Sequence, residues 1–184
     1  MITRRGVLLL CLAIAACAVQ PPPDTASVPF GAFGTMDNDV GAMNQATWAF
    51  ASPSRTLNNP VDAAKAAAAV DYLGGELSSN PRWVTMSPMT KLQMLQARVD
   101  VRRALGIRPD APSQLVVDAL MRFAALWQSG NQPAAMQVLS SPVFTLAPVQ
   151  TLQVLSNMPY IQSANVATMN ASGQADNGGG MRLP

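Results

Sequence analysis

The sequence predicts an all-α protein, a compact bundle of about five to seven short helices between two disordered ends. Three observations lead to this prediction. Only 12% of the 184 residues are charged and Ala, Gln, Met and Leu are abundant, which is typical of a compact helical domain. Several of the 15 prolines follow a helix-capping residue at the start of an apolar pattern. No segment shows a convincing strand pattern.

Proline positions define where most helices begin. Proline is tolerated in the first turn of a helix and blocks its interior, so a capping residue followed by proline marks a start. Asn59-Pro60 and Ser87-Pro88 are two such starts. Gly106 supplies a stop after the second of them. The predicted helices cover residues 39–51, 60–73, 89–105, 113–128, 133 to before Pro142, 145–157 and 159–169.

The apolar spacing predicts which helix faces are buried. In the helix over 89–105, Met89, Leu92, Leu95 and Val99 recur at steps of three and four, as one buried stripe requires. In the helix over 113–128, the apolar residues form a stripe too wide for a surface helix. We therefore expect that helix to lie at the centre of the bundle.

The N-terminus has the pattern of an export signal. Arg4 and Arg5 are followed by eleven uncharged residues, 6–16. A bilayer-spanning helix needs about twenty apolar residues, whereas this length suits a signal-peptide core. A short buried helix of a cytosolic protein is the alternative, which the Pro-rich break after Cys17 disfavours. We expect residues 1–16 to form a signal peptide.

Residues Ile14-Ala15-Ala16-Cys17 resemble the lipobox of bacterial lipoprotein precursors. The resemblance covers only the first twenty or so residues and identifies no family for the remaining chain. It implies cleavage between Ala16 and Cys17, a diacylglyceryl thioether on Cys17, and acylation of the new amino group. Ala18 after that cysteine implies the outer membrane. Cleavage after Ala18 by an ordinary signal peptidase is the competing interpretation of this site. Residues 3–8 also resemble a twin-arginine export motif, which would be a different export route.

The rest of the chain divides into three parts. Residues 17–35 carry Pro21-Pro22-Pro23 and are expected to be a lipidated, semi-rigid tether. Residues 36–169 form the helical domain. Residues 170–184 are rich in Gly and Asn and are expected to be a disordered tail.

Composition argues against several classes of chemistry. The chain has no histidine, the usual general base and metal ligand. Cys11 lies in the signal peptide and Cys17 would be consumed by lipid, so we predict no metal and no cofactor. Without Arg4 and Arg5 the twelve basic residues become ten, equal to the ten acidic ones. A neutral domain is not an electrostatic nucleic-acid binder.

Three features remain as candidate sites. Glu76, the only glutamate, could act as the general acid of a wall-cleaving enzyme or be a solvated residue at a helix end. Lys91, Arg98 and Arg102 share one helix face, either as an anion site or as a solvated surface. Arg82-Trp83 could anchor a partner protein, or Trp83 could cover the end of the bundle.

We therefore predict a lipid-anchored envelope protein with a structural or protein-interaction role and no chemistry of its own. Its partners would be the membrane and another envelope protein. This function predicts an exposed apolar patch around Trp83, or near Phe144 and Tyr160. The first alternative, a cell-wall-acting enzyme using Glu76, predicts a carboxylate in a deep cleft. The second, a carrier of a small apolar ligand, predicts an enclosed cavity lined by Met and Leu.

Overall fold

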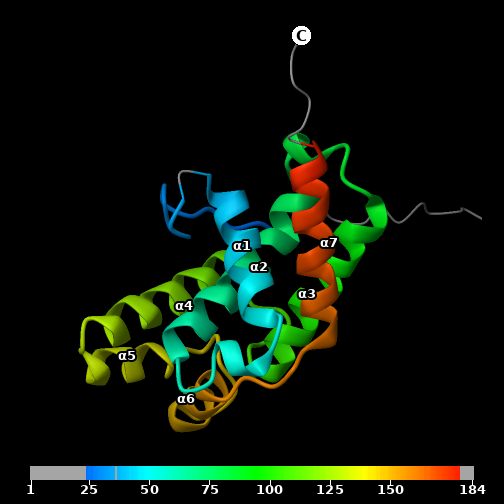
Figure 1. Cartoon of the computed structure of the whole chain (residues 1–184). Helices are drawn as coiled ribbons and strands as arrows, with labels where there is room; N and C mark the ends of the chain where they lie inside the picture. The colour runs from blue at the N-terminus through cyan, green and yellow to red at the C-terminus, as the bar shows by residue number, and fades with distance from the viewer. Residues whose placement is uncertain (1–23, 36, 179–184) are drawn as a thin grey trace, which may run out of the picture.

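The computed structural model describes residues 24–35 and 37–178 and confirms the all-α prediction. In the described residues the elements are seven α-helices and two 3₁₀ turns (Figure 1). In chain order they are α1 (Asn38–Phe50), η1 (Pro53–Arg55), α2 (Pro60–Ser79), η2 (Pro81–Trp83), α3 (Pro88–Ala104), α4 (Ser113–Gln128), α5 (Gln132–Val138), α6 (Pro148–Ser156) and α7 (Gln162–Gly178).

The prolines begin helices as the sequence predicts. Pro60, Pro88, Pro133 and Pro148 each lie in a first turn, where the missing N–H has no intrahelical partner to lose. The side chain of Asn59 accepts a hydrogen bond from the Asp62 amide and caps α2. Local chemistry thus accounts for where these helices start.

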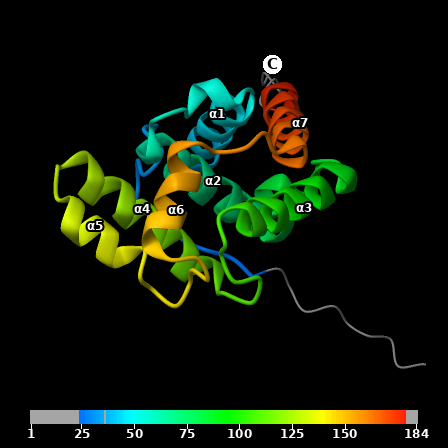
Figure 2. The same cartoon turned by 90° about the horizontal axis from the view of Figure 1, so that it is seen from below.

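The central helix is α2, so the prediction for residues 113–128 is wrong. Fourteen of the twenty residues of α2 are buried, and α1, α3, α4 and α6 all pack on it (Figures 1 and 2). Its small alanines, 66–69 among them, let neighbouring helices approach from several sides. By contrast, α4 lies at the edge and leaves Leu115 53% exposed.

The buried face of α3 also differs from the prediction. Met89, Leu92 and Val99 are 62%, 60% and 46% exposed, whereas the stripe on which they lie was expected to be buried. The sequence of α3 holds two apolar stripes, and the inner one combines small and flexible side chains that fit against α2 and α7. The buried residues of this inner stripe are Thr90, Met94, Ala97 and Val101.

Both predicted boundaries of the domain require correction. Residues 24–28 of the predicted tether pack on the domain, and Ala26 is buried. The final helix, α7, continues to Gly178, so 170–178 are not part of a disordered tail. Ala171 is buried, and Gln174 donates a hydrogen bond to Thr90 Oγ1 at 2.7 Å. Packing against α3 thus outweighs the weak helix propensity of the Gly- and Asn-rich sequence.

Other predictions fall on residues outside the described ones. The signal peptide, Ala16, Cys17 and residues 179–184 belong to this group. Within residues 24–35 and 37–178, no helix is both long and apolar enough to span a bilayer.

Candidate functional site

A polar network lies at the C-terminal end of α2 and includes two of the predicted partner-binding residues. Its centre is the buried carboxylate of Asp39, at the start of α1. Asp39 accepts hydrogen bonds from the Tyr72 hydroxyl at 2.6 Å, the Trp83 indole N–H at 2.9 Å and the Arg82 guanidinium at 3.2 Å. Trp83 is therefore a core residue at the end of the bundle, 8% exposed, rather than a surface anchor.

Arg82 lies at the surface of this network and connects it to solvent. Its guanidinium pairs with Asp37 at 2.5 Å and stacks over the Trp83 ring, 4.7 Å from the ring centre. The hydrogen bond from Arg82 lowers the pKa of Asp37 below its ordinary value of 3.8. The pair therefore contributes stability above pH 3.8, and this contribution is lost as the pH falls through the lowered pKa. Burial, and then the bond to Asp39, raises the pKa of the Tyr72 phenol, which keeps it a hydrogen-bond donor.

Glu76 borders a polar hollow beside this network. The hollow measures about 530 Å³, and Asp37, Asp39, Tyr72 and Arg82 also line it. Glu76 is partly buried and its carboxylate accepts a hydrogen bond from the side chain of Asn80, the last residue before η2. The neighbouring carboxylates are held by Arg82, Tyr72 and Trp83. Within the described residues, no group of three or more acidic, histidine or cysteine side chains could hold a metal ion.

The basic residues of α3 have different environments. Arg102 is 6% exposed and forms a two-pronged ion pair with Asp71 of α2, at 2.6 and 2.8 Å. Its remaining donors bond to the Ala111 carbonyl at 2.8 Å and the Ser113 hydroxyl at 3.0 Å. Arg102 is thus a structural residue that joins α2, α3 and the start of α4, and it has no free face for an external anion.

Arg98 holds the N-terminal segment instead of facing solvent. It donates hydrogen bonds to the Asp24 carbonyl at 2.9 Å and to the Ser113 hydroxyl at 3.1 Å. Burial lowers the pKa of Arg98. The Asp24 carboxylate in turn accepts a hydrogen bond from the Ser113 amide at the start of α4. Lys91, on the same face of α3, is partly buried two turns earlier.

In the part of α2 that continues past its predicted end at residue 73, Gly75 lies against the N-terminal segment and Gly74 lies against α3. A Cβ on Gly75 would approach the Asp24 carbonyl oxygen to 2.5 Å and the Thr25 Cα to 2.8 Å. A Cβ on Gly74 would approach the Arg98 side chain to 3.0 Å. The glycines therefore provide a close-contact surface between α2, α3 and residues 24–25.

We predict that Gly75→Val releases the N-terminal segment. The new side chain would collide with backbone atoms that cannot rotate away, and α4 would lose its Asp24 cap. Stability should fall by about 1 to 3 kcal/mol. Amide hydrogen exchange should rise at residues 24–28 and remain slow in α2.

The control variant for this prediction is Gly173→Ala, also within a helix. A Cβ at that position meets nothing within 4 Å, so exchange in residues 24–28 should stay as in the wild type. Unchanged exchange in the Gly75→Val protein would contradict the proposed close contact.

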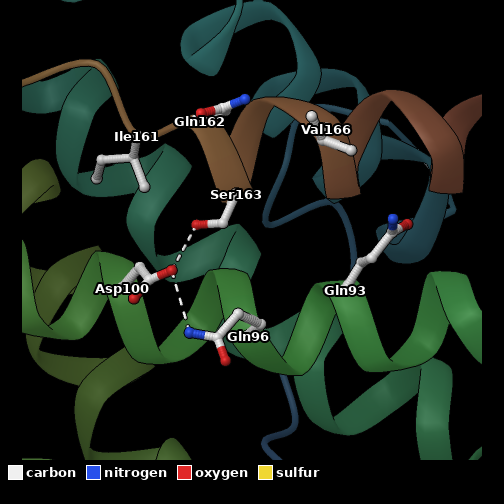
Figure 3. Close-up of a pocket in the computed structure, with 7 residues that line it drawn as sticks. All are labelled: Gln93, Gln96, Asp100, Ile161, Gln162, Ser163 and Val166. Atoms are coloured by element: carbon white, nitrogen blue, oxygen red, sulfur yellow. Dashed lines mark hydrogen bonds between the residues drawn. The ribbon is translucent and has the colours of Figure 1, made fainter.

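A second hollow is a groove between α3 and α7 (Figure 3). It measures about 500 Å³, and Ile161 and Val166 form its apolar part. Figure 3 shows Asp100 of α3 between Ser163 of α7 and Gln96; both donate to one carboxylate oxygen, at 2.8 and 3.2 Å. These bonds lower the pKa of Asp100. The groove is thus bridged by a helix-to-helix contact.

Sequence reasoning missed three acidic residues that organise the structure: Asp24, Asp39 and Asp71. Only Asp71 carried a usable signal, since it is a charged residue inside the apolar run of 66–73. Such a residue must be paired when buried, although its partner Arg102 lies 31 positions away. Of the two residues near which an exposed apolar patch is predicted, Tyr160 is 53% exposed, whereas Phe144 is buried.

Comparisons with models of protein families, with curated proteins and with solved structures give no match for this chain.

Proposed function

We propose that this chain is a lipid-anchored envelope protein whose helical domain has a structural or protein-interaction role. The proposal begins with the lipobox-like residues that precede Cys17. One structural observation carries it further: Asp24, the first residue that the structure describes, is bonded to the domain only seven residues after Cys17. A lipid on Cys17 would therefore hold this domain close to a membrane.

The use of the charged groups favours a structural or interaction role over chemistry. Arg102 and Asp71 join three helices, and Asp39 joins α1 to α2 and η2. A catalytic acid or base needs a group able to reach a substrate and exchange a proton. The strongest candidate, Glu76, instead accepts a hydrogen bond from its helix neighbour Asn80. The proposed partner is another envelope protein, and the proposed address is the periplasmic face of the outer membrane.

The test is intact-mass analysis with membrane fractionation of the wild-type and Cys17→Ala proteins in a Gram-negative host. We expect the wild type to lose residues 1–16, gain acyl mass and pellet with membranes. The Cys17→Ala protein should remain unacylated and should not pellet.

A mature wild-type protein that starts at Val19 and stays soluble would refute the lipid anchor. If the anchor is found, crosslinking in the intact envelope should then recover a protein partner. Crosslinking only to itself or to lipid would contradict the role in binding another envelope protein.

A further inference from the structure

The outer face of α3 is an apolar surface that the fold leaves uncovered. Met89, Leu92 and Val99 lie on it, 62%, 60% and 46% exposed. Helices α2 and α7 pack on the other side of α3, where Thr90, Met94 and Ala97 are buried. Arg98 lies at the edge between that buried side and the exposed one. We use the name outer α3 face for these three residues together with Arg103.

One exposed cationic group, Arg103, adjoins the apolar residues of this face. It lines a hollow of about 420 Å³ at the end of α3 with Val99 and with Arg98 and Arg102, whose guanidinium groups are bonded within the domain. The Arg103 side chain is 72% exposed and is paired with Asp100 at 2.7 Å. A guanidinium group in this setting can keep its charge in water or donate to a phosphate, while its stem covers apolar surface. Apolar side chains beside arginine are the combination found on membrane-surface helices.

The N-terminal segment reaches the domain beside this same face. Asp24 is bonded to Arg98, one residue before Val99 in α3. Figure 2 shows the first described residues passing α3 on the side away from α7. From Asp24 to Cys17 is seven residues, which span at most roughly 25 Å when fully extended. A membrane anchor at Cys17 would therefore hold the bilayer within reach of the outer α3 face.

We propose that the outer α3 face rests on the surface of the membrane in which Cys17 is anchored. Leu92 and Val99 enter the boundary between headgroups and acyl chains, and Arg103 contacts lipid phosphates. This inference rests on the proposed lipid anchor. It adds a defined orientation, in which α3 faces the bilayer and the α5–α6 end of the domain points away from it.

The test places a fluorescent probe on single cysteines of the full lipoprotein in vesicles of phosphatidylethanolamine and phosphatidylglycerol. The mature sequence has no other cysteine than Cys17, whose sulfur is blocked when it carries lipid. Leu92→Cys and Val99→Cys therefore each offer one thiol for an environment-sensitive probe. Leu57→Cys is the matched control, because Leu57 is 52% exposed and precedes α2 at the end opposite Gly75.

We expect probes at 92 and 99 to shift to shorter emission wavelengths and to be quenched by lipids with brominated acyl chains. The probe at 57 should show neither effect. Acylated protein with a water-exposed, unquenched probe at 92 would overturn the membrane contact and leave the anchor intact. If the probes at 92 and 99 are shielded from water in detergent, and this shielding increases with protein concentration, the face contacts a second copy of the chain. That result would also overturn the membrane contact. Missing acyl mass and a second probe on Cys17 would refute the anchor itself, and this proposal with it.

Discussion

Replacing Asp71 with alanine is expected to lower the free energy of unfolding by about 3 to 5 kcal/mol, because it leaves Arg102 charged and buried without its partner. The ion pair is largely shielded from water, with both side chains at most 7% exposed. The loss also loosens the position of Arg102, which bonds to the Ala111 carbonyl and Ser113. Urea unfolding followed by circular dichroism measures the effect. Asp71→Asn, which keeps one hydrogen-bond acceptor, should give a smaller loss.

The matched control is Arg108→Ala, which removes the exposed ion pair with Asp110. That pair lies in water, where such contacts contribute little. We therefore expect the unfolding midpoint to stay close to that of the wild type. Equal effects of Asp71→Ala and Arg108→Ala would show that the buried pair does not hold α2, α3 and α4 together.

Replacing Asp39 with alanine is expected to have the second large effect, a loss of about 3 to 5 kcal/mol. The Tyr72 hydroxyl and the Trp83 indole N–H would both lose their acceptor at the end of α2. A buried donor without an acceptor costs about 1 to 3 kcal/mol. Trp83 would become more mobile, so the tryptophan fluorescence of the protein should move to longer wavelengths as water reaches this ring.

Two variants separate the contributions to this network. Tyr72→Phe removes one donor and leaves the carboxylate with two, so we expect a loss of about 1 to 2 kcal/mol. Asp37→Asn weakens the half-exposed pair with Arg82 and keeps a side-chain oxygen for the cap of α1, so the loss should stay below about 1 kcal/mol. A loss with Asp39→Ala no greater than with Asp37→Asn would contradict the central role of Asp39.

Local sequence chemistry was sufficient to predict the fold class and most helix starts. A proline in a first turn and an asparagine that caps an amide act over three or four residues. The positions of Pro60, Pro88 and Pro148 therefore determine helix starts whatever surrounds them. The order of the helices follows from the same rules, whereas α2 and α7 end later than predicted.

The buried faces could not be predicted in this way. Helix α3 carries one apolar stripe through Leu92 and another through Met94, and periodicity gives both similar weight. The choice was made by contacts distant in sequence, above all the pair between Arg102 and Asp71 and the small residues of α2. Those contacts place Met94 inside and leave Leu92 60% exposed.

The sequence by itself thus determined an all-α chain with defined helix starts, and it predicts an export signal ending at Cys17. Only the tertiary structure decided that α2 is central, that Arg98 binds the segment at Asp24, and which face of α3 remains open. The physical reason is the range of the interactions. Capping and proline geometry are local, whereas burial of a charge or a close helix contact depends on partners tens of residues away.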